Sequence, residues 1–126
     1  MRLQLCDIYL ESFHPYSVYK KQSKICGEWG MSALEAAALG KVVVTNFFSH
    51  ERYEQEYGKH AIQIANSYDE IETQLRKLIL MSDEEFLALQ KSSRQWVLDQ
   101  HSYTVVGKRL LDIFNTYFKH IKWEDI

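Results

Sequence analysis

The chain has 126 residues, of which 46% are hydrophobic, 25% charged and 13% aromatic, a composition that suits one globular domain spanning residues 1–126. The net charge of −2, with Lys and Arg spread along the chain, argues against a general nucleic-acid binder, which usually carries a basic face. Only one Pro and five Gly are present, so long flexible linkers are not expected.

The first predicted element is a short strand at Asp7–Leu10, because three of its four residues favour extended backbone. The polar stretch Glu11–Gly27 holds the single Pro and predicts a loop. Gly30–Leu39 is rich in Ala and Leu and predicts a helix. Gly40 follows at the place where a helix C-terminus favours positive φ.

A continuous Val run, Val42–Val44, predicts a strand buried on both faces, which is typical of parallel sheets. Glu51–Tyr57 predicts a short helix that ends at Gly58, and Ala61–Ala65 alternates as a strand. Strands that alternate with helices indicate βαβ units and a parallel sheet.

Three helices are predicted after the last strand. Ser67 with Glu70, and Ser82 with Glu85, have the spacing of capping boxes at two helix starts. A third helix is predicted from Tyr103 onward. Apolar residues recur at helical spacing in the three segments: Ile71, Leu75 and Leu78; Phe86, Leu89, Trp96 and Val97; and Val106, Leu110, Ile113, Tyr117 and Ile121.

The predicted fold class is α/β: a Rossmann-like partial domain in three layers, with a short parallel sheet flanked by helices. Three strands make a small sheet, since sheets usually have four to six. The chain therefore resembles the second half of a larger doubly wound domain. An open strand edge at Asp7–Leu10 would invite association with another chain.

The stretch Gly30–Gly40 carries the candidate chemistry. The first turn of a helix has unpaired N–H groups and a dipole that favours an anion, so a pyrophosphate would fit there. Gly30 allows close approach of a ligand, and Ser32 offers a hydroxyl donor. Glu35, one turn further, is placed to accept hydrogen bonds from two ribose hydroxyls. An exposed helix residue without a ligand is the alternative for Glu35.

The same stretch resembles the signature of glycosyltransferase family 4 and its GT-B relatives. That signature has a Glu, an aromatic-Gly pair, Leu-Glu-Ala, a further Gly and a Val-Val strand. The matching residues are Trp29-Gly30, Leu34-Glu35-Ala36, Gly40 and Val43-Val44. Flanking stretches also match in order and spacing: Cys6–Leu10, Ser49–Glu51, Ala61–Ala65, Ser67–Leu80 and His101–Thr104.

The resemblance implies the C-terminal, donor-binding part of a retaining glycosyltransferase in polysaccharide or glycoconjugate biosynthesis. Its substrate would be a nucleoside-diphosphate sugar, with no cofactor and no metal, and no catalytic residue is identified. Glu35 would bind the ribose, and the first signature Glu falls at Gly27, with Glu28 one residue away. The donor-binding residues implied in this way are Glu28, Trp29, Gly30, Met31, Ser32, Glu35 and His50.

The resemblance also implies that an acceptor domain and the first part of the donor domain lie outside these residues. The chain would then be a fragment, a degenerate protein or one half of a split enzyme. The alternative function is an inactive interaction subunit, which pairs through its sheet edge as a homodimer or with a partner chain that carries the acceptor domain.

The remaining polar residues suggest few further sites. The five His show no metal-ligand spacing and are expected on the surface or in loops, with His50 nearest the predicted cleft. Three basic residues are expected either to form a solvated cluster or to contact phosphate or anionic lipid: Lys20, Lys21 and Lys24. Contact with lipid would place the chain at the periphery of a membrane.

A cytoplasmic location is expected. Cys6 and Cys26 form no metal or redox motif and are expected to be reduced, although one disulfide is arithmetically possible. No apolar run approaches the roughly 20 residues that span a bilayer, and the first residues do not resemble a signal peptide. Aromatic residues of the last helix are expected in the core: Phe114, Tyr117 and Phe118. In the family that this chain resembles, the helix also packs on the other domain, and without that domain the rings would be exposed.

Overall fold

The computed structural model describes residues 6–11 and 29–118. The elements follow the predicted order of alternating strands and helices, and then three helices. They are β1 (Ile8–Leu10), α2 (Met31–Ala38), β2 (Val42–Thr45), α3 (His50–Tyr57), β3 (Gln63–Ile64), α4 (Tyr68–Ile79), α5 (Asp83–His101) and α6 (Tyr103–Tyr117). The strand predicted at Ala61–Ala65 is shorter than expected, and most of the predicted loop lies outside the described residues.

The three strands form one parallel sheet in the order β1-β2-β3. Ile8 is opposite Val42 in the register of β1 and β2, and Val44 is opposite Gln63 in that of β2 and β3. All four residues of the central strand β2 are buried, as the Val run predicted. The predicted α/β class is confirmed, and this short parallel sheet is compatible with a Rossmann-like partial fold.

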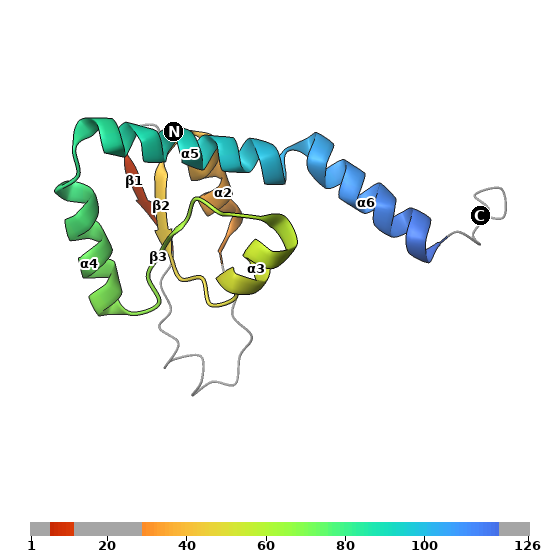
Figure 1. Cartoon of the computed structure of the whole chain (residues 1–126), viewed down its shortest axis with the longest axis horizontal. Coiled ribbons are helices and arrows are strands. Elements are labelled where there is room, and N and C mark those ends of the chain that lie inside the picture. Colours follow the sequence, from red (N-terminus) through yellow and green to blue (C-terminus); the bar gives the residue numbers. More distant parts are fainter. Residues whose placement is uncertain (1–5, 12–28, 119–126) are drawn as a thin grey trace.

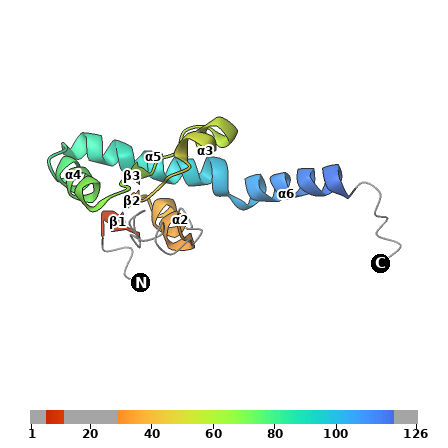
Figure 2. The ribbon, with the colours of Figure 1, turned by 90° about the horizontal axis from the view of Figure 1, so that it is seen from below.

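Helices cover both faces of the sheet, so the three predicted layers are present (Figures 1 and 2). On one face, the small residues of α2 pack against Val43; they are Ala33, Ala36 and Ala37. On the other face, Val42 and Val44 pack with Leu78 of α4. Alternate residues of β2 therefore serve two separate hydrophobic clusters, as the period of a strand requires.

Helix α5 joins the two clusters. It runs across the sheet near the end where β1 and β2 begin (Figure 1). Its first half contributes Phe86 and Leu89 to the α4 side, and its second half contributes Trp96 and Val97 to the α2 side. The carboxyl ends of the strands point away from α5 (Figure 1), so Glu11, which follows β1, and the loop that follows β2 lie at the opposite end of the sheet.

Two of the predicted local signals are confirmed and one is wrong in part. Gly40 has φ 73°, as predicted for the end of α2. Ser82 and Glu85 form the full capping box of α5. The Ser67 hydroxyl accepts from the Glu70 amide, but the Glu70 carboxylate accepts from the amide of Asn66, 2.8 Å away. The Glu70 carboxylate therefore accepts from the residue before the N-cap and not from Ser67, so only the Ser67 half of the predicted capping box forms.

Helix α6 projects from the rest of the molecule (Figures 1 and 2). Phe114 and Tyr117 of α6 and the following Phe118 are 47%, 69% and 44% exposed. The prediction of a core position is therefore wrong, and the alternative of exposed rings is the one that the structure shows. Apolar periodicity identifies the face of a helix, but it does not identify what covers that face. Among the described residues, no helix combines the length and apolar character needed to cross a membrane.

Candidate functional site

The start of α2 is the first part of the candidate site. Gly30 is the N-cap, with φ −93° and ψ 172°, and as a glycine it supplies no side-chain cap. The hydroxyl of Ser32 points to Glu11, donating to its Oε2 at 2.9 Å. Met31 and Glu35 are exposed on the same helix. The N-cap residue therefore leaves the first-turn N–H groups uncapped, which suits an anion site.

Glu11 lies against this helix start. Its amide donates to the carbonyl of Val44 at 3.2 Å and so extends the pairing of β1 with β2. Its Oε2 is 3.3 Å from the position that a Cβ on Gly30 would take. A carboxylate is thus the group nearest the predicted phosphate position, where the helix dipole favours negative charge. Sequence reasoning did not single out Glu11, although it directly follows a strand of a parallel sheet, where ligand sites often lie.

Glu35 lies three residues after Ser32, so the two side chains share one face of α2. Glu35 is exposed, which leaves its carboxylate available to a ligand on the outer face of the helix. Glu28 lies outside the described residues, and its predicted role stays a prediction.

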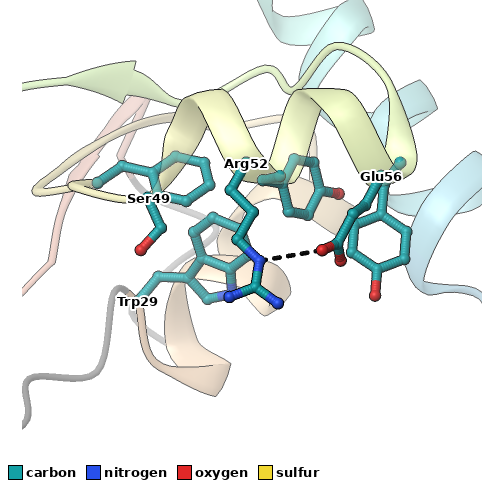
Figure 3. A pocket seen from close by; sticks show the side chains of 7 residues that line it. Trp29, Ser49, Arg52 and Glu56 are labelled. Atoms are coloured by element: carbon teal, nitrogen blue, oxygen red, sulfur yellow. Dashed lines mark hydrogen bonds and ion pairs between the residues drawn. The ribbon is translucent and has the colours of Figure 1, made fainter.

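Trp29, immediately before α2, lines an open pocket of about 300 Å³ (Figure 3). The other residues of this pocket come from the loop after β2 and from α3. Its apolar lining consists of Trp29, Phe47, Tyr53 and Tyr57. Its polar lining consists of Ser49, Arg52 and Glu56. Trp29 is covalently next to Gly30, so the pocket adjoins the start of α2.

The aromatic walls of the pocket meet at steep angles. The ring centroids of Trp29 and Phe47 are 4.4 Å apart with an interplanar angle of 74°. Those of Trp29 and Tyr53 are 5.5 Å apart with an angle of 78°. Edge-to-face packing of this kind is favourable and fixes ring orientation. The pocket is therefore an apolar corner with walls nearly at right angles.

An ion pair forms the polar rim. Arg52 Nε lies 3.0 Å from Glu56 Oε1, one helical turn away on α3. The two side chains are 81% and 45% exposed, so solvent reaches both. The hydrogen bond that Arg52 donates to Glu56 raises the pKa of Arg52, which stays charged. Figure 3 shows the Arg52 side chain extending from α3 toward Trp29, with Glu56 beside it.

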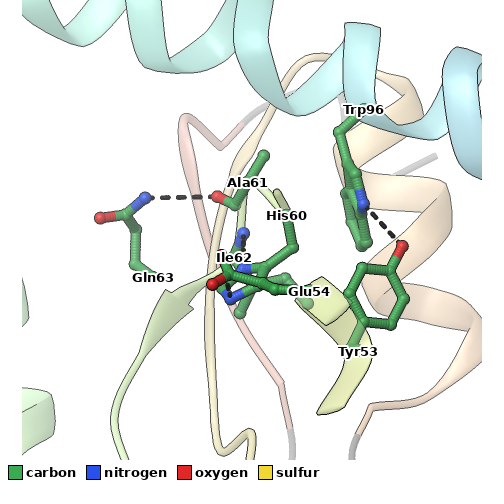
Figure 4. A network of polar contacts seen from close by, with 7 residues as sticks. All are labelled: Tyr53, Glu54, His60, Ala61, Ile62, Gln63 and Trp96. Atoms are coloured by element: carbon green, nitrogen blue, oxygen red, sulfur yellow. Dashed lines mark hydrogen bonds and ion pairs between the residues drawn. The ribbon is translucent and has the colours of Figure 1, made fainter. Parts of the chain in front are cut away.

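A chain of hydrogen bonds supports the pocket from behind. The indole Nε1 of Trp96 donates to the Tyr53 hydroxyl at 2.9 Å (Figure 4), and that hydroxyl lies 3.2 Å from Nε2 of His101. Burial raises the pKa of Tyr53. Burial, followed by the charge of Arg109, lowers the pKa of His101. Neutral His101 with its proton on Nδ1 can accept a hydrogen bond from the Tyr53 hydroxyl, so the Trp96 N–H and the Tyr53 O–H each have an acceptor.

The histidines are less peripheral than predicted. His60 Nδ1 accepts from the amide of Ile62 at 3.2 Å (Figure 4), and burial lowers its pKa. His60 lies in the loop before β3, as predicted, but it is partly buried among aromatic rings. His101 is the last residue of α5 and is also partly buried, so the prediction of a surface or loop position is wrong for His101. The His50 ring lies 6.2 Å from those of Phe47 and His60 and does not line the pocket.

Two further findings concern polar groups. Within residues 6–11 and 29–118, no three His, Cys, Asp or Glu side chains gather as a metal site would require. Asn46, at the carboxyl end of β2, is only 4% exposed, and its Nδ2 has no hydrogen-bond partner among the described residues. Cys6 is described and Cys26 is not, so the predicted reduced state of both stays a prediction.

The structure brings together only part of the predicted site. Trp29, Gly30 and Ser32 adjoin one another at the start of α2, and Glu35 is one turn away. His50 lies beside Phe47 and His60 and does not line the pocket. The polar residues of α3 that border the pocket were not predicted, although Arg52 and Glu56 have the spacing of an i,i+4 ion pair. Comparisons with known proteins add no family: the chain matches no protein-family model, no curated protein and no solved structure.

Proposed function

We propose that this chain is the donor-binding part of a retaining, GT-B type glycosyltransferase that uses a nucleoside-diphosphate sugar. The observation that carries the proposal is the start of α2, where Gly30 leaves the helix without a side-chain cap and Glu35 is exposed one turn on. The GT-B origin and the retaining outcome rest on the resemblance of Trp29–Val44 to the family signature.

The arrangement suits a diphosphate that is joined to a ribose. N–H groups of the first turn would meet phosphate oxygens, and the dipole would stabilise the charge that develops on the leaving group. Glu35 would accept hydrogen bonds from the two ribose hydroxyls. Bound phosphate would also accept from Ser32, whose hydroxyl now donates to Glu11.

Glu11 opposes this binding by like-charge repulsion, because its carboxylate lies beside Gly30. A phosphate must therefore displace this carboxylate or leave it at the edge of the site. For that reason, we expect this chain to bind a diphosphate only weakly, with millimolar affinity.

Isothermal titration calorimetry with UDP and GDP tests the proposal. We expect binding in the millimolar range and a further loss of about tenfold in Glu35→Ala, the size of one charge-assisted hydrogen bond. Glu72→Ala, on α4, serves as the control for loss of an exposed carboxylate and should bind as the wild type does. The absence of binding heat at millimolar concentrations of both nucleotides would refute the proposal for this chain.

A second function, an interaction subunit, is supported by α6. Five of its exposed apolar residues recur at intervals of three and four: Tyr103, Val106, Leu110, Ile113 and Tyr117. That interval is the seam of a helix that pairs with another helix. β1 also lies at an edge of the sheet within the described residues, where a further strand could pair.

A further inference from the structure

We propose that the pocket between Trp29 and α3 binds a neutral pyranose ring by its apolar face and by two adjacent hydroxyls. The volume, rim and walls of the pocket are the only basis for a pyranose site. The identification of the ring as part of a sugar donor rests on the proposed function.

The size of the pocket limits the ligand. At about 300 Å³ it is at the lower end of the range of small-molecule sites, which is about 300–1,000 Å³. One ring fits such a space, and an extended chain of rings does not. The ligand therefore has a single ring, or a single terminal ring of something larger that continues into solvent.

The rim carries no net charge. Arg52 and Glu56 are paired at a separation of 3.0 Å, so the pair as a whole favours neither a cation nor an anion. A guanidinium supplies donors and a carboxylate supplies acceptors. A vicinal diol matches this pair, because each hydroxyl both donates and accepts.

The walls select the shape of the ring. Trp29 meets Phe47 and Tyr53 at 74° and 78°, so no two of these walls form the parallel slot that holds a flat base by stacking on both sides. A pyranose chair is puckered, with C–H groups on one face and hydroxyls around its edge. Its C–H face can lie on one aromatic wall while its edge reaches the rim. Ser49 also lines this rim.

The test follows the indole N–H of Trp29, assigned with Trp29→Phe, in ¹H–¹⁵N spectra of the full chain. The probes are the methyl glycosides of glucose, galactose, mannose and N-acetylglucosamine, then UDP-glucose and GDP-mannose, then UDP and GDP alone. We expect a pyranose-containing probe to shift the Trp29 signal. Glu56→Gln should weaken that binding about tenfold, because a charge-assisted hydrogen bond is lost.

Glu72→Gln is the matched control. The pair of Glu72 with Arg76 is also an exposed i,i+4 ion pair on a helix, with a separation of 2.8 Å, but it lies on α4 outside the pocket. Both variants lose one solvent-exposed pair and should remain folded to the same extent. Equal weakening in the two variants would overturn the assignment of Glu56.

The outcomes identify the source of the ring and test the two proposals separately. Shifts with methyl glycosides support a free sugar or glycan end as the source, and shifts only with nucleotide sugars support the donor. Equal shifts with UDP or GDP alone would identify a base and overturn the inference, as would no shift with any probe. Glycoside binding without diphosphate binding refutes only the donor function, and Glu35-dependent diphosphate binding with Trp29 unmoved refutes only the pyranose site.

Discussion

The indole of Trp96 donates a hydrogen bond of 2.9 Å to the hydroxyl of Tyr53, and this bond joins α5 to α3. The two residues are 43 positions apart in the sequence. Trp96 belongs to the core beside α2, while Tyr53 lines the pocket. The bond therefore holds the Tyr53 side chain, a wall of the pocket, in place relative to the hydrophobic core.

Removal of the Tyr53 hydroxyl should destabilise the chain. Tyr53→Phe keeps the ring but leaves the Trp96 N–H without its acceptor in a mostly buried place. A buried polar group without a partner costs about 1–3 kcal/mol. Urea unfolding should show that loss, while Tyr57→Phe, on the more exposed ring of the same helix, should change stability by less than about 0.5 kcal/mol. Equal stability of the two variants would contradict the role of the bond.

Stability should fall when the pH drops from about 7.5 to 5.5. Burial lowers the folded-state pKa of His60 and of His101 below that of the unfolded chain, about 6.5. The unfolded chain then binds more protons between these values, so stability is full above about pH 6.5 and decreases as the pH falls toward the folded pKa values. His60 faces Glu54, which opposes its shift, and His50, which adds to it, while Arg109 adds to the shift of His101.

Urea midpoints at the two pH values check this prediction. The double variant His60→Gln/His101→Gln should show a smaller difference between pH 7.5 and 5.5 than the wild type. The range stops above the pH at which Glu85 titrates, since its pKa is lowered by the hydrogen bonds of the α5 cap. An unchanged pH dependence in the double variant would assign the effect to other groups.

Glu11→Gln should strengthen diphosphate binding. The amide keeps the size and an acceptor for Ser32 but removes the negative charge beside Gly30. Removal of a nearby like charge at a solvent-accessible site should improve affinity a few-fold, and more at low salt. Calorimetry with UDP at two salt concentrations measures both, with Glu72→Gln as the control. A weaker affinity in Glu11→Gln would mean that the carboxylate organises the site instead of obstructing it.

Much of the fold follows from local patterns. The Val run predicted a strand buried on both faces, because a strand covered by helices on both faces has apolar residues, often β-branched, at successive positions. Gly40 predicted the end of α2, because positive φ is costly for other residues. These signals lie within a few residues of the structure that they specify, so the sequence displays them directly.

The pocket could not be predicted in the same way, because its walls come from three separate segments. Trp29 precedes α2, Phe47 follows β2 and Tyr57 ends α3. These segments come together only in the folded chain, where the rings of Phe47 and Tyr53 pack against that of Trp29. Glu11 was missed for the same reason, since its contact with Ser32 spans 21 positions. Periodicity likewise could not show that α6 projects from the rest of the chain.

The last prediction concerns association through α6. Leu110 lies at the centre of the exposed apolar stripe that runs from Tyr103 to Tyr117, and it is 50% exposed. A stripe with intervals of three and four residues pairs with another helix, and a second copy of α6 offers the same stripe. We expect light scattering to show a dimer at high protein concentration.

Leu110→Glu should reduce this association, because two carboxylates would enter the seam. Leu111→Glu is the matched control: the same change on the next residue, which is 63% exposed and lies off the stripe. The Leu111→Glu variant should still form a dimer, since a charge at that position stays in solvent. A clean monomer for the wild type at high concentration would exclude α6 as a pairing surface for this chain, and equal loss in both variants would show that the stripe is not the contact. Dimerisation that survives Leu110→Glu would point instead to the edge strand β1, whose backbone can pair without any side chain of α6.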